Sequence, residues 1–187
     1  MRSIRLVDPE LDAVRVADIY RPHVVEGLVS FEEVPPTTEQ MAERMRSTLA
    51  RTPWLVAEED GVVVGFAYAG RHRERAGYRW SVDISVYVDG PWHRRGVGRA
   101  LYTELLDMLR RQGFVNVFAG ITIPNPGSVG LHEQIGMRQI GVYEKVGYKF
   151  GEWHDVAWFG MRLTEPVDPP REPIPLPELR PLARGNP

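Results

Sequence analysis

The chain has 187 residues, of which 43% are hydrophobic and 26% are charged, a composition typical of one globular domain with a buried core. Its formal net charge of -2 argues against a nucleic-acid partner, because affinity for nucleic acid depends mainly on an excess of Lys and Arg. The lack of cysteine excludes disulfides, thiolate metal sites and cysteine nucleophiles.

No targeting or membrane segment is predicted. The first residues lack the apolar stretch of a signal peptide, and no segment reaches the ~18 apolar residues of a membrane span. We therefore expect a cytoplasmic protein with no membrane partner.

The first half of the chain predicts one strand, two helices and three strands. Residues 4–8 alternate like a strand, and the apolar positions of residues 11–25 recur every three to four residues, as in a helix. Thr37 or Thr38 can cap a second helix that runs to Arg51. Strands are then expected at 54–58 and 62–68, on both sides of the hairpin dipeptide Asp60-Gly61, and at 79–88.

The second half predicts two helices and three strands. A helix begins at Gly96, a short helix spans 128–136, and strands are expected at 114–123, 137–146 and 154–163. The order is β-α-α-β-β-β-α-β-α-β-β, a mixed α/β (α+β) class. Eight of the sixteen prolines lie in residues 165–187, so we expect an extended or disordered tail after a domain at 1–164.

A turn with two glycines joins the strand at 79–88 to the helix that follows. Free backbone N–H groups and the helix dipole make such a helix start an anion site, and Gly96 and Gly98 let an anion approach the backbone. Positive charge around the turn comes from Arg94, Arg95 and Arg99. A tight turn with a solvated basic rim is the alternative. The turn lacks the Gly-Lys-Ser/Thr ending of an ATP-binding P-loop, and no G-x-G-x-x-G dinucleotide motif is present.

The element order and this turn resemble the GCN5-related N-acetyltransferase superfamily, whose loop pattern is Gln/Arg-x-x-Gly-x-Gly/Ala. His93 departs from the pattern at its first position. Several stretches between residues 3 and 163 are similar, in order, to the phosphinothricin N-acetyltransferase family: residues 53–58, 67–70, 86–88, 128–133, 147–149 and 153–156. The resemblance implies a mixed, mostly antiparallel sheet of about seven strands, with a splayed parallel pair and flanking helices.

The resemblance also implies acetyl-CoA as co-substrate. Its pantetheine arm would pair with the backbone of Val86, Tyr87 and Val88, and Asn125 would contact its amides. Its pyrophosphate would be held by Arg94, Arg95, Gly96, Val97, Gly98 and Arg99. The alternative role for Asn125 is that of a turn residue before Pro126.

Two residues are candidates for catalysis. Asp83 is an acid inside an apolar strand, where burial raises the pKa of a carboxyl group toward that of a useful base. The resembled family has a longer Glu here, regarded as the general base; the alternative is a carboxylate satisfied by neighbouring hydroxyls or an Arg. His132 stands where the family has a His and many superfamily members a Tyr, which is thought to protonate the thiolate. A surface His paired with Glu133 is the other interpretation. For His154 the sequence leaves a substrate-side role and a structural role open.

The basic loop 71–78 is a candidate for the substrate side. The resemblance assigns substrate contacts to Phe31, Arg73, Arg75 and Tyr78. A small amino acid with a second anionic group would need a cationic clamp of this kind, whereas a solvated charged loop is the alternative. The five His residues show no metal-ligand spacing, so no metal is expected.

The leading hypothesis is an acetyl-CoA-dependent N-acetyltransferase that acts by direct transfer on phosphinothricin, methionine sulfone, methionine sulfoximine or a similar amino acid. One alternative is another amine, such as a peptide N-terminus, a polyamine or an aminoglycoside. A non-catalytic acyl-CoA-binding sensor is the third hypothesis, because Asp83 replaces the family Glu. By analogy with the family we expect a homodimer, with residues 156–161 contributing to its interface.

Overall fold

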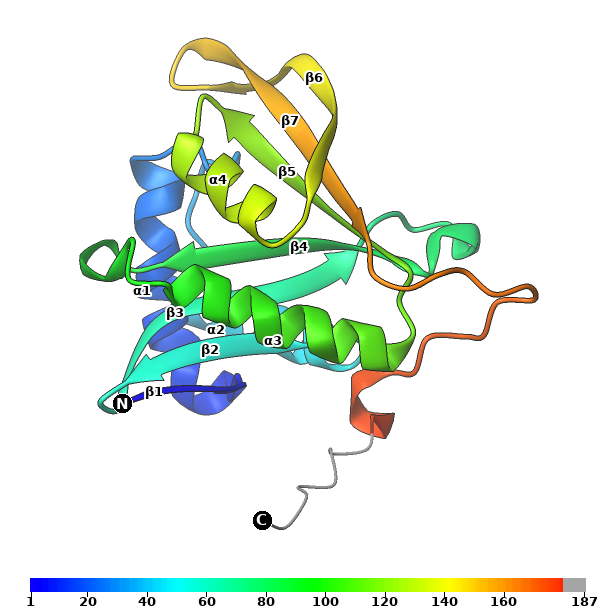
Figure 1. Ribbon diagram of the computed structural model, residues 1–187. Coiled ribbons are helices and arrows are strands. Elements are labelled where there is room, and N and C mark those ends of the chain that lie inside the picture. Colours follow the sequence, from blue (N-terminus) through cyan, green and yellow to red (C-terminus); the bar gives the residue numbers. More distant parts are fainter. Residues whose placement is uncertain (180–187) are drawn as a thin grey trace.

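The computed structural model describes residues 1–179, which form one sheet with helices on both faces (Figure 1). In chain order the elements are β1 (Arg2–Leu6), α1 (Pro9–Val25), α2 (Thr38–Leu49), β2 (Trp54–Glu59), β3 (Val62–Arg71), β4 (Ser81–Val88), α3 (Val97–Gln112), β5 (Asn116–Ile123), α4 (Pro126–Gln134), β6 (Arg138–Lys149) and β7 (Glu152–Arg162). Three short 3-10 helices are η1 (Ala76–Tyr78), η2 (Gly90–Trp92) and η3 (Leu176–Glu178). The predicted order of strands and helices is confirmed.

The seven strands lie in the order β1-β2-β3-β4-β5-β7-β6, and only β4 and β5 are parallel. Their pairing covers residues 81–83 of β4 and 116–118 of β5, and ends at Asp83 and Phe118. Beyond this point the two strands diverge, as Figure 1 shows. The expected mixed sheet with a splayed parallel pair is confirmed.

The helix starts follow from their capping residues. The Asp8 carboxylate accepts hydrogen bonds from the amides of Glu10 and Leu11, and Pro9 occupies the first helical position of α1. Thr37 caps α2 in a capping box with Gln40, which decides between the two predicted threonines.

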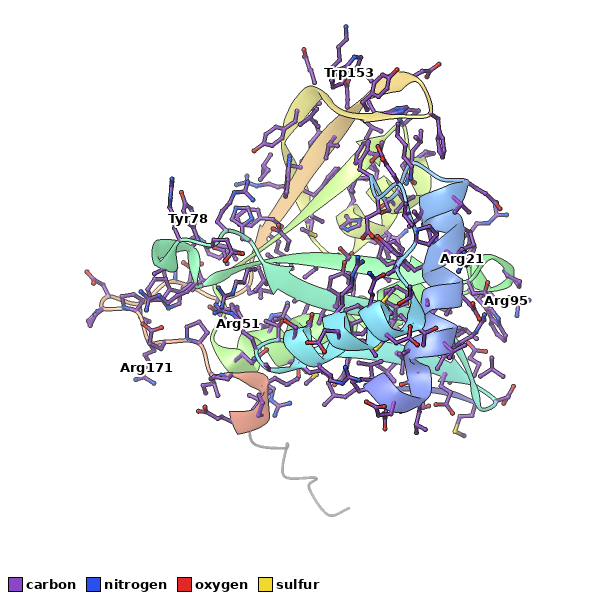
Figure 2. All side chains as sticks on the ribbon, turned by 180° about the vertical axis from the view of Figure 1, so that it is seen from behind. Arg21, Arg51, Tyr78, Arg95, Trp153 and Arg171 are labelled. Carbon is purple, nitrogen blue, oxygen red and sulfur yellow. The ribbon has the colours of Figure 1, made fainter. Side chains whose placement is uncertain are left out.

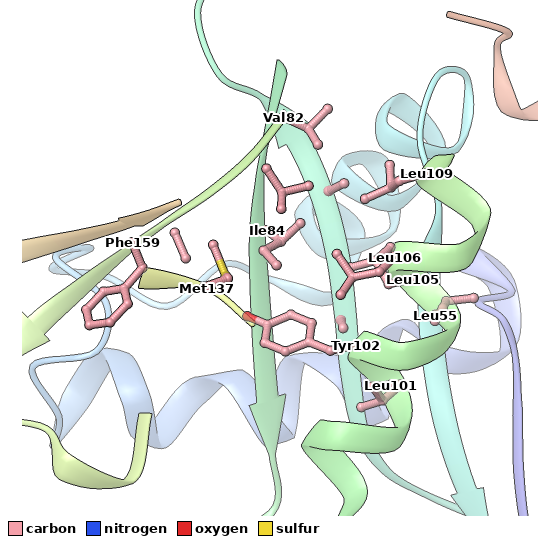
Figure 3. Packing of buried hydrophobic residues seen from close by; sticks show 14 of the residues in the cluster. Leu55, Val82, Ile84, Leu101, Tyr102, Leu105, Leu106, Leu109, Met137 and Phe159 are labelled. Atoms are coloured by element: carbon pink, nitrogen blue, oxygen red, sulfur yellow. The ribbon is translucent and has the colours of Figure 1, made fainter. Parts of the chain in front are cut away.

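Two cores, one on each face, fix the orientation of β4. α3 packs Leu101, Leu105 and Leu109 against one face (Figure 3), and α1 and α2 pack residues such as Val16 and Met45 against the other. Val82 and Ile84 of β4 belong to the α3 side. Because side chains alternate along a strand, Asp83 lies on the α1 and α2 face.

Residues 165–179 run back along the domain. The Ile174 amide donates to the Gln112 carbonyl (2.7 Å), and the Leu176 amide donates to the Arg51 carbonyl (3.0 Å). Leu176 is buried, and the Gln112 side chain donates to the carbonyls of both Arg51 and Ile174. This part of the predicted tail is therefore attached to the end of α3, and the rest of it, residues 180–187, lies outside the described residues.

Within residues 1–179, no helix is both long and apolar enough to cross a membrane. The same stretch contains no group of three or more His, Asp or Glu side chains arranged to hold a metal ion.

Candidate active site

The free edge of β4 forms one side of the gap between β4 and β5. In an antiparallel pair, positions that exchange hydrogen bonds alternate with positions that do not. The Asp89 amide donates to the Val64 carbonyl of β3 (2.9 Å), so the odd-numbered positions of β4 bond to β3. The N–H and C=O groups of Val86 and Val88 therefore face the gap, where β5 no longer pairs with them.

Tyr87 differs from its two neighbours. Its backbone lies opposite Phe66 of β3, and its buried ring packs edge-on against Tyr20 of α1, with centroids 5.0 Å apart. Of the three predicted backbone contacts to pantetheine, the structure therefore presents those of Val86 and Val88 to the gap.

The turn after η2 leads into α3 through Gly96, which has φ +77° and caps the helix without a side chain. The N–H groups at the cap and the first three helical positions, Gly96 to Arg99, have no acceptor within the helix. Arg94, Arg95 and Arg99 are exposed around them, and the Arg95 guanidinium lies 4.9 Å from the Trp92 ring centroid. This is a helix start open to an anion.

Gly98 faces the free edge of β4. A Cβ atom at Gly98 would lie 3.1 Å from Leu131 Cδ2, 3.7 Å from Val86 Cγ2 and 3.8 Å from Val88 Cγ2. A side chain here would fill the space between α3, α4 and the strand edge. The residues present thus fit a ligand with an elongated amide-containing arm joined to a diphosphate, as acetyl-CoA has.

His93 at the start of the turn contacts the same strand edge. Its Nε2–H donates to the Val88 carbonyl over 2.8 Å, because a carbonyl oxygen can only accept. His93 thereby ties the turn to the end of β4 and engages the Val88 carbonyl, so the backbone of Val86 and the Val88 N–H are the groups that a ligand in the gap would meet.

Asp83 lies at the point where β4 and β5 separate. Burial raises the pKa of its carboxyl group, while the hydrogen bond from His72 and the charge of Arg73 act in the opposite direction. The Asp83 Oδ1 atom lies 2.6 Å from His72 Nδ1. Asp83 is therefore paired with a histidine and not with the hydroxyls or the Arg of the alternative interpretation, and this histidine is itself a proton-transfer group.

His72 is a site residue that the sequence did not single out. It follows the end of β3, and its ring packs against Phe118 of β5 with centroids 4.5 Å apart. Trp158 of β7 and Tyr78 of η1 lie at 6.2 Å from it. The available signal was its register: β3 pairs Gly70 with Asp83, so the residue just past Arg71 lies near the acid.

His132 on α4 is buried at 3% exposure, so it is not the predicted surface residue paired with Glu133. Its Nδ1–H donates to the Ser128 carbonyl (2.7 Å), and its Nε2 accepts from the Tyr102 hydroxyl (3.0 Å). Burial lowers the pKa of His132, against the effect of the Ser128 hydrogen bond. The ring is a neutral imidazole with both nitrogens engaged.

Asn125 caps α4, because its Oδ1 accepts from the Ser128 amide (3.0 Å). This is the turn role that the sequence offered as the alternative. The side-chain amide nitrogen of Asn125 is left available, since the cap uses only the oxygen.

The predicted substrate residues lie on two separate segments. Arg73 lies over the Trp158 ring at 5.8 Å, and Tyr78 is half-exposed beside His72. Figure 2 shows Tyr78 and Arg95 on opposite sides of the molecule, at the two ends of β4. Arg75 precedes η1 and is exposed.

Phe31 lies on the loop between α1 and α2 and packs on the β6–β7 hairpin. Its ring covers Gly147, where a Cβ atom would come within 2.3 Å of it, and lies 6.2 Å from the His154 ring. The His154 Nε2–H donates to the Lys149 carbonyl (3.0 Å). This hydrogen bond within the β6–β7 hairpin is a structural contact.

Lys149 attaches this loop to β6. Its buried ammonium donates to the carbonyls of Val24 (2.7 Å), Gly27 (3.0 Å) and Ser30 (2.5 Å). The position of Phe31, the next residue after Ser30, therefore depends on Lys149.

A pocket of about 610 Å³ lies elsewhere, between α2 and strands β2 and β3. Its lining includes Gln40, Arg44 and Trp54, and contains none of the predicted site residues. We place the candidate site at the gap between β4 and β5, because Asp83, the free edge of β4 and the turn before α3 border that gap.

The comparisons with known proteins show the family of the chain. A family model described as an acetyltransferase (GNAT) domain matches residues 4–158. The chain is 40% identical to phosphinothricin N-acetyltransferase of Streptomyces viridochromogenes, over 90% of this chain and 91% of the relative. It is 33% identical to the L-methionine sulfoximine/L-methionine sulfone acetyltransferase of Salmonella typhimurium, over 89% and 98% of the two chains.

Among solved structures, a GNAT superfamily phosphinothricin acetyltransferase from Sinorhizobium meliloti, in complex with acetyl-CoA, superposes with a TM-score of 0.84 and 30% identity, and covers 96% of this chain and 98% of its own. The fold and the site therefore define an acetyltransferase. More closely, the chain belongs to the GCN5-related N-acetyltransferase superfamily and, within it, to the phosphinothricin N-acetyltransferase-like family.

Proposed function

We propose that the protein transfers the acetyl group of acetyl-CoA directly to the amino group of a small amino acid such as phosphinothricin, methionine sulfone or methionine sulfoximine. The observation that carries the proposal is the half-buried carboxylate of Asp83 at the point where β4 and β5 part, next to the free edge of β4. Relatives named for these substrates, at 33% and 40% identity, support the substrate class.

Acetyl-CoA would supply an activated acyl group as a thioester. In this proposal Val86 and Val88 pair with its amide arm, the Asn125 side-chain nitrogen donates to it, and the turn from Arg94 to Arg99 binds its pyrophosphate. The free N–H groups and the arginines of this turn would offset the negative charge.

Asp83 would accept, directly or through its partner, the proton that an ammonium must lose before its nitrogen can attack a carbonyl carbon. In this proposal His132 assists the departing thiolate as a hydrogen-bond donor through its Nδ1–H, which in the structure donates to the Ser128 carbonyl. The neutral ring keeps that hydrogen, since losing it would leave an imidazolate, and the thiolate takes up a proton that the attacking nitrogen releases. Since an ordinary thiol has a pKa near ~8.5, a modest donor is sufficient.

Arg73, Arg75, Tyr78 and Phe31 are the proposed substrate contacts. Arg73 lies next to the acid and stacks on Trp158, so a carboxylate or phosphinate of the substrate would meet fixed positive charge close to the reacting amine. Arg75 would have to approach from its exposed position before η1.

The test is a competition assay with acetyl-CoA and four amines: phosphinothricin, methionine sulfone, methionine sulfoximine and a peptide N-terminus. We expect kcat/KM for the best of the three amino acids to exceed that for the peptide by at least tenfold. A preference for the peptide would contradict the proposed amino-acid substrate class. Tight CoA binding without transfer to any amine would favour the acyl-CoA sensor.

A homodimer is a further part of the proposal. β7 pairs with β5 on one side and with β6 on the other, so the backbone edges of residues 156–161 are both occupied within the sheet. We therefore propose that the edge strand β6, and not residues 156–161, forms the interface. Exposed apolar side chains on β6 include Ile140, Tyr143, Val146 and Tyr148. Light scattering of the purified protein measures the assembly, and a monomer at micromolar concentration would contradict it.

A further inference from the structure

We infer that His72 is a catalytic residue: its Nε2 atom accepts the proton of the substrate ammonium, and Asp83 holds the imidazole in the tautomer that this step needs. The inference rests on the proposed function and adds a residue to its chemistry.

The first support is the geometry of the pair. His72 Nδ1 and Asp83 Oδ1 are 2.6 Å apart, a short distance typical of a charge-assisted hydrogen bond. An ionised carboxylate can only accept, so Nδ1 carries the hydrogen and Nε2 keeps its lone pair. Among the described residues Nε2 has no hydrogen-bond partner. The free lone pair is the basic atom of the pair.

The second support is the packing of the ring. His72 is 15% exposed in its side chain and lies among Phe118, Trp158 and Tyr78, which come from three different elements. Three aromatic neighbours and one carboxylate leave the imidazole little freedom to rotate. A general base has to be held within reach of the proton that it takes, and this ring is held on several sides.

The third support is the short side chain of Asp83. Asp83 is one methylene shorter than the Glu that the family resemblance places here, so its carboxylate alone ends closer to the strand. The imidazole of His72 extends the reach of the acid by the width of a ring. The Asp–His pair thus takes the place of a single longer side chain, with the same division of roles as the His and Asp of a catalytic triad.

The step balances as follows. One N–H bond of the ammonium breaks, and its proton passes to His72 Nε2, which leaves a neutral amine. The amine nitrogen forms a bond to the thioester carbonyl carbon, the C–S bond breaks, and the nitrogen loses a second proton as the amide forms. The thiolate takes up one proton and His72 returns the other to water, so one proton is released overall. No oxidant or metal is needed.

The charged and titratable groups that face this pair come from two segments. They are Arg73, whose charge lowers the pKa of Asp83, and Tyr78, whose ring lies 6.2 Å from His72. The variants that test the pair therefore leave Arg73 and Tyr78 unchanged.

The test compares His72→Phe, which keeps an aromatic ring against Phe118, with Asp83→Glu and with the double variant. We expect His72→Phe to lower kcat at least about 100-fold, within the range that a general base contributes, and to remove the acidic limb of the kcat/KM profile. Its Kd for acetyl-CoA should stay unchanged. Adding Asp83→Glu to His72→Phe should recover at least about tenfold of the lost kcat, because the longer carboxylate reaches further.

His23→Phe is the matched control. His23 lies on α1, outside the site, and its ring centroid is 5.2 Å from that of Tyr87. This variant should keep the wild-type kcat and pH profile. His72→Gln is interpreted in the same way if His72→Phe does not fold. Wild-type kcat and an unchanged profile in a folded His72 variant would overturn the role of His72 alone. A wild-type protein that acetylates none of the amines would overturn the proposed function, and the base with it.

Discussion

The Tyr102 hydroxyl donates a hydrogen bond to the Nε2 atom of His132 over 3.0 Å, inside the core between α3 and α4. Removing the imidazole would leave that hydroxyl and the Ser128 carbonyl without their partner. We expect His132→Phe to lower the free energy of unfolding by about 1–3 kcal/mol, the cost of leaving buried polar groups unsatisfied. It should lower kcat about tenfold, because a thiolate needs only a modest donor.

Urea denaturation and steady-state kinetics on the same preparation check both numbers for His132. Tyr102→Phe serves as the control, since it removes the hydroxyl and keeps the imidazole. A folded His132→Phe variant with wild-type kcat would show that His132 is structural only.

Asp83→Asn should separate activity from stability. We expect turnover to fall by two or more orders of magnitude, because an amide cannot take part in the transfer of a proton as a base. Since burial raises the pKa of Asp83 in the folded protein, the folded state holds its proton to higher pH than the unfolded state does. The wild type therefore loses stability as pH rises from the unfolded value, about 3.9, through the folded one.

The stability of Asp83→Asn relative to wild type should accordingly rise with pH over the same range. Thermal unfolding of both proteins between pH 4 and 8, read together with kcat, measures it. A relative stability that falls with pH would mean that the pairing with His72 outweighs burial.

Gly98→Val should prevent the binding of acetyl-CoA. A side chain at Gly98 would occupy the space before Val86, Val88 and Leu131, where a cofactor has to approach the backbone. We expect the Kd for CoA, measured by calorimetry, to rise at least about 100-fold, equivalent to about 2.7 kcal/mol. Gly130→Ala is the control, because a Cβ atom there has nothing within 4 Å. Unaltered CoA binding by Gly98→Val would mean that the segment is only a turn.

Lys149→Met should act on the amino-acid side alone. Without the ammonium, the carbonyls of Val24, Gly27 and Ser30 lose their shared donor, and the loop that carries Phe31 is released from β6. We expect KM for the amine to rise about tenfold or more, a change of ~1.4 kcal/mol, while the Kd for CoA is unchanged. Lys145→Met, at an exposed position of β6, is the control. A fall in kcat with no change in KM would contradict this role.

Much of the fold could be predicted because its signals are local. The Asp60-Gly61 hairpin and the apolar spacing of α3 each depend on neighbouring residues, and both appear in the structure. The boundaries differed where local signals were weak: α4 begins at Pro126, two residues before the predicted start, because Asn125 supplies the cap. The attachment of Leu176 to the domain could not be predicted, since it depends on a hydrogen bond to Arg51, more than a hundred residues away.

The candidate site was predictable where one segment forms it and not where several meet. The turn from Arg94 to Gly98 is a single segment and could be recognised from its glycines. His72 was missed because its significance arises from strand register, which brings it to Asp83, and from rings on β5 and β7. The burial of His132 could not be read from α4 alone, because its partner Tyr102 lies on α3.

The most direct test of the account is to incubate the purified protein with acetyl-CoA and methionine sulfoximine and to follow both products, free CoA thiol by colorimetry and N-acetyl-methionine sulfoximine by mass spectrometry. We predict that the two appear in equal amounts with the wild type and that both fall at least about 100-fold with Asp83→Asn. Thiol release without acetylated amine, or equal product from wild type and Asp83→Asn, would contradict direct transfer assisted by Asp83.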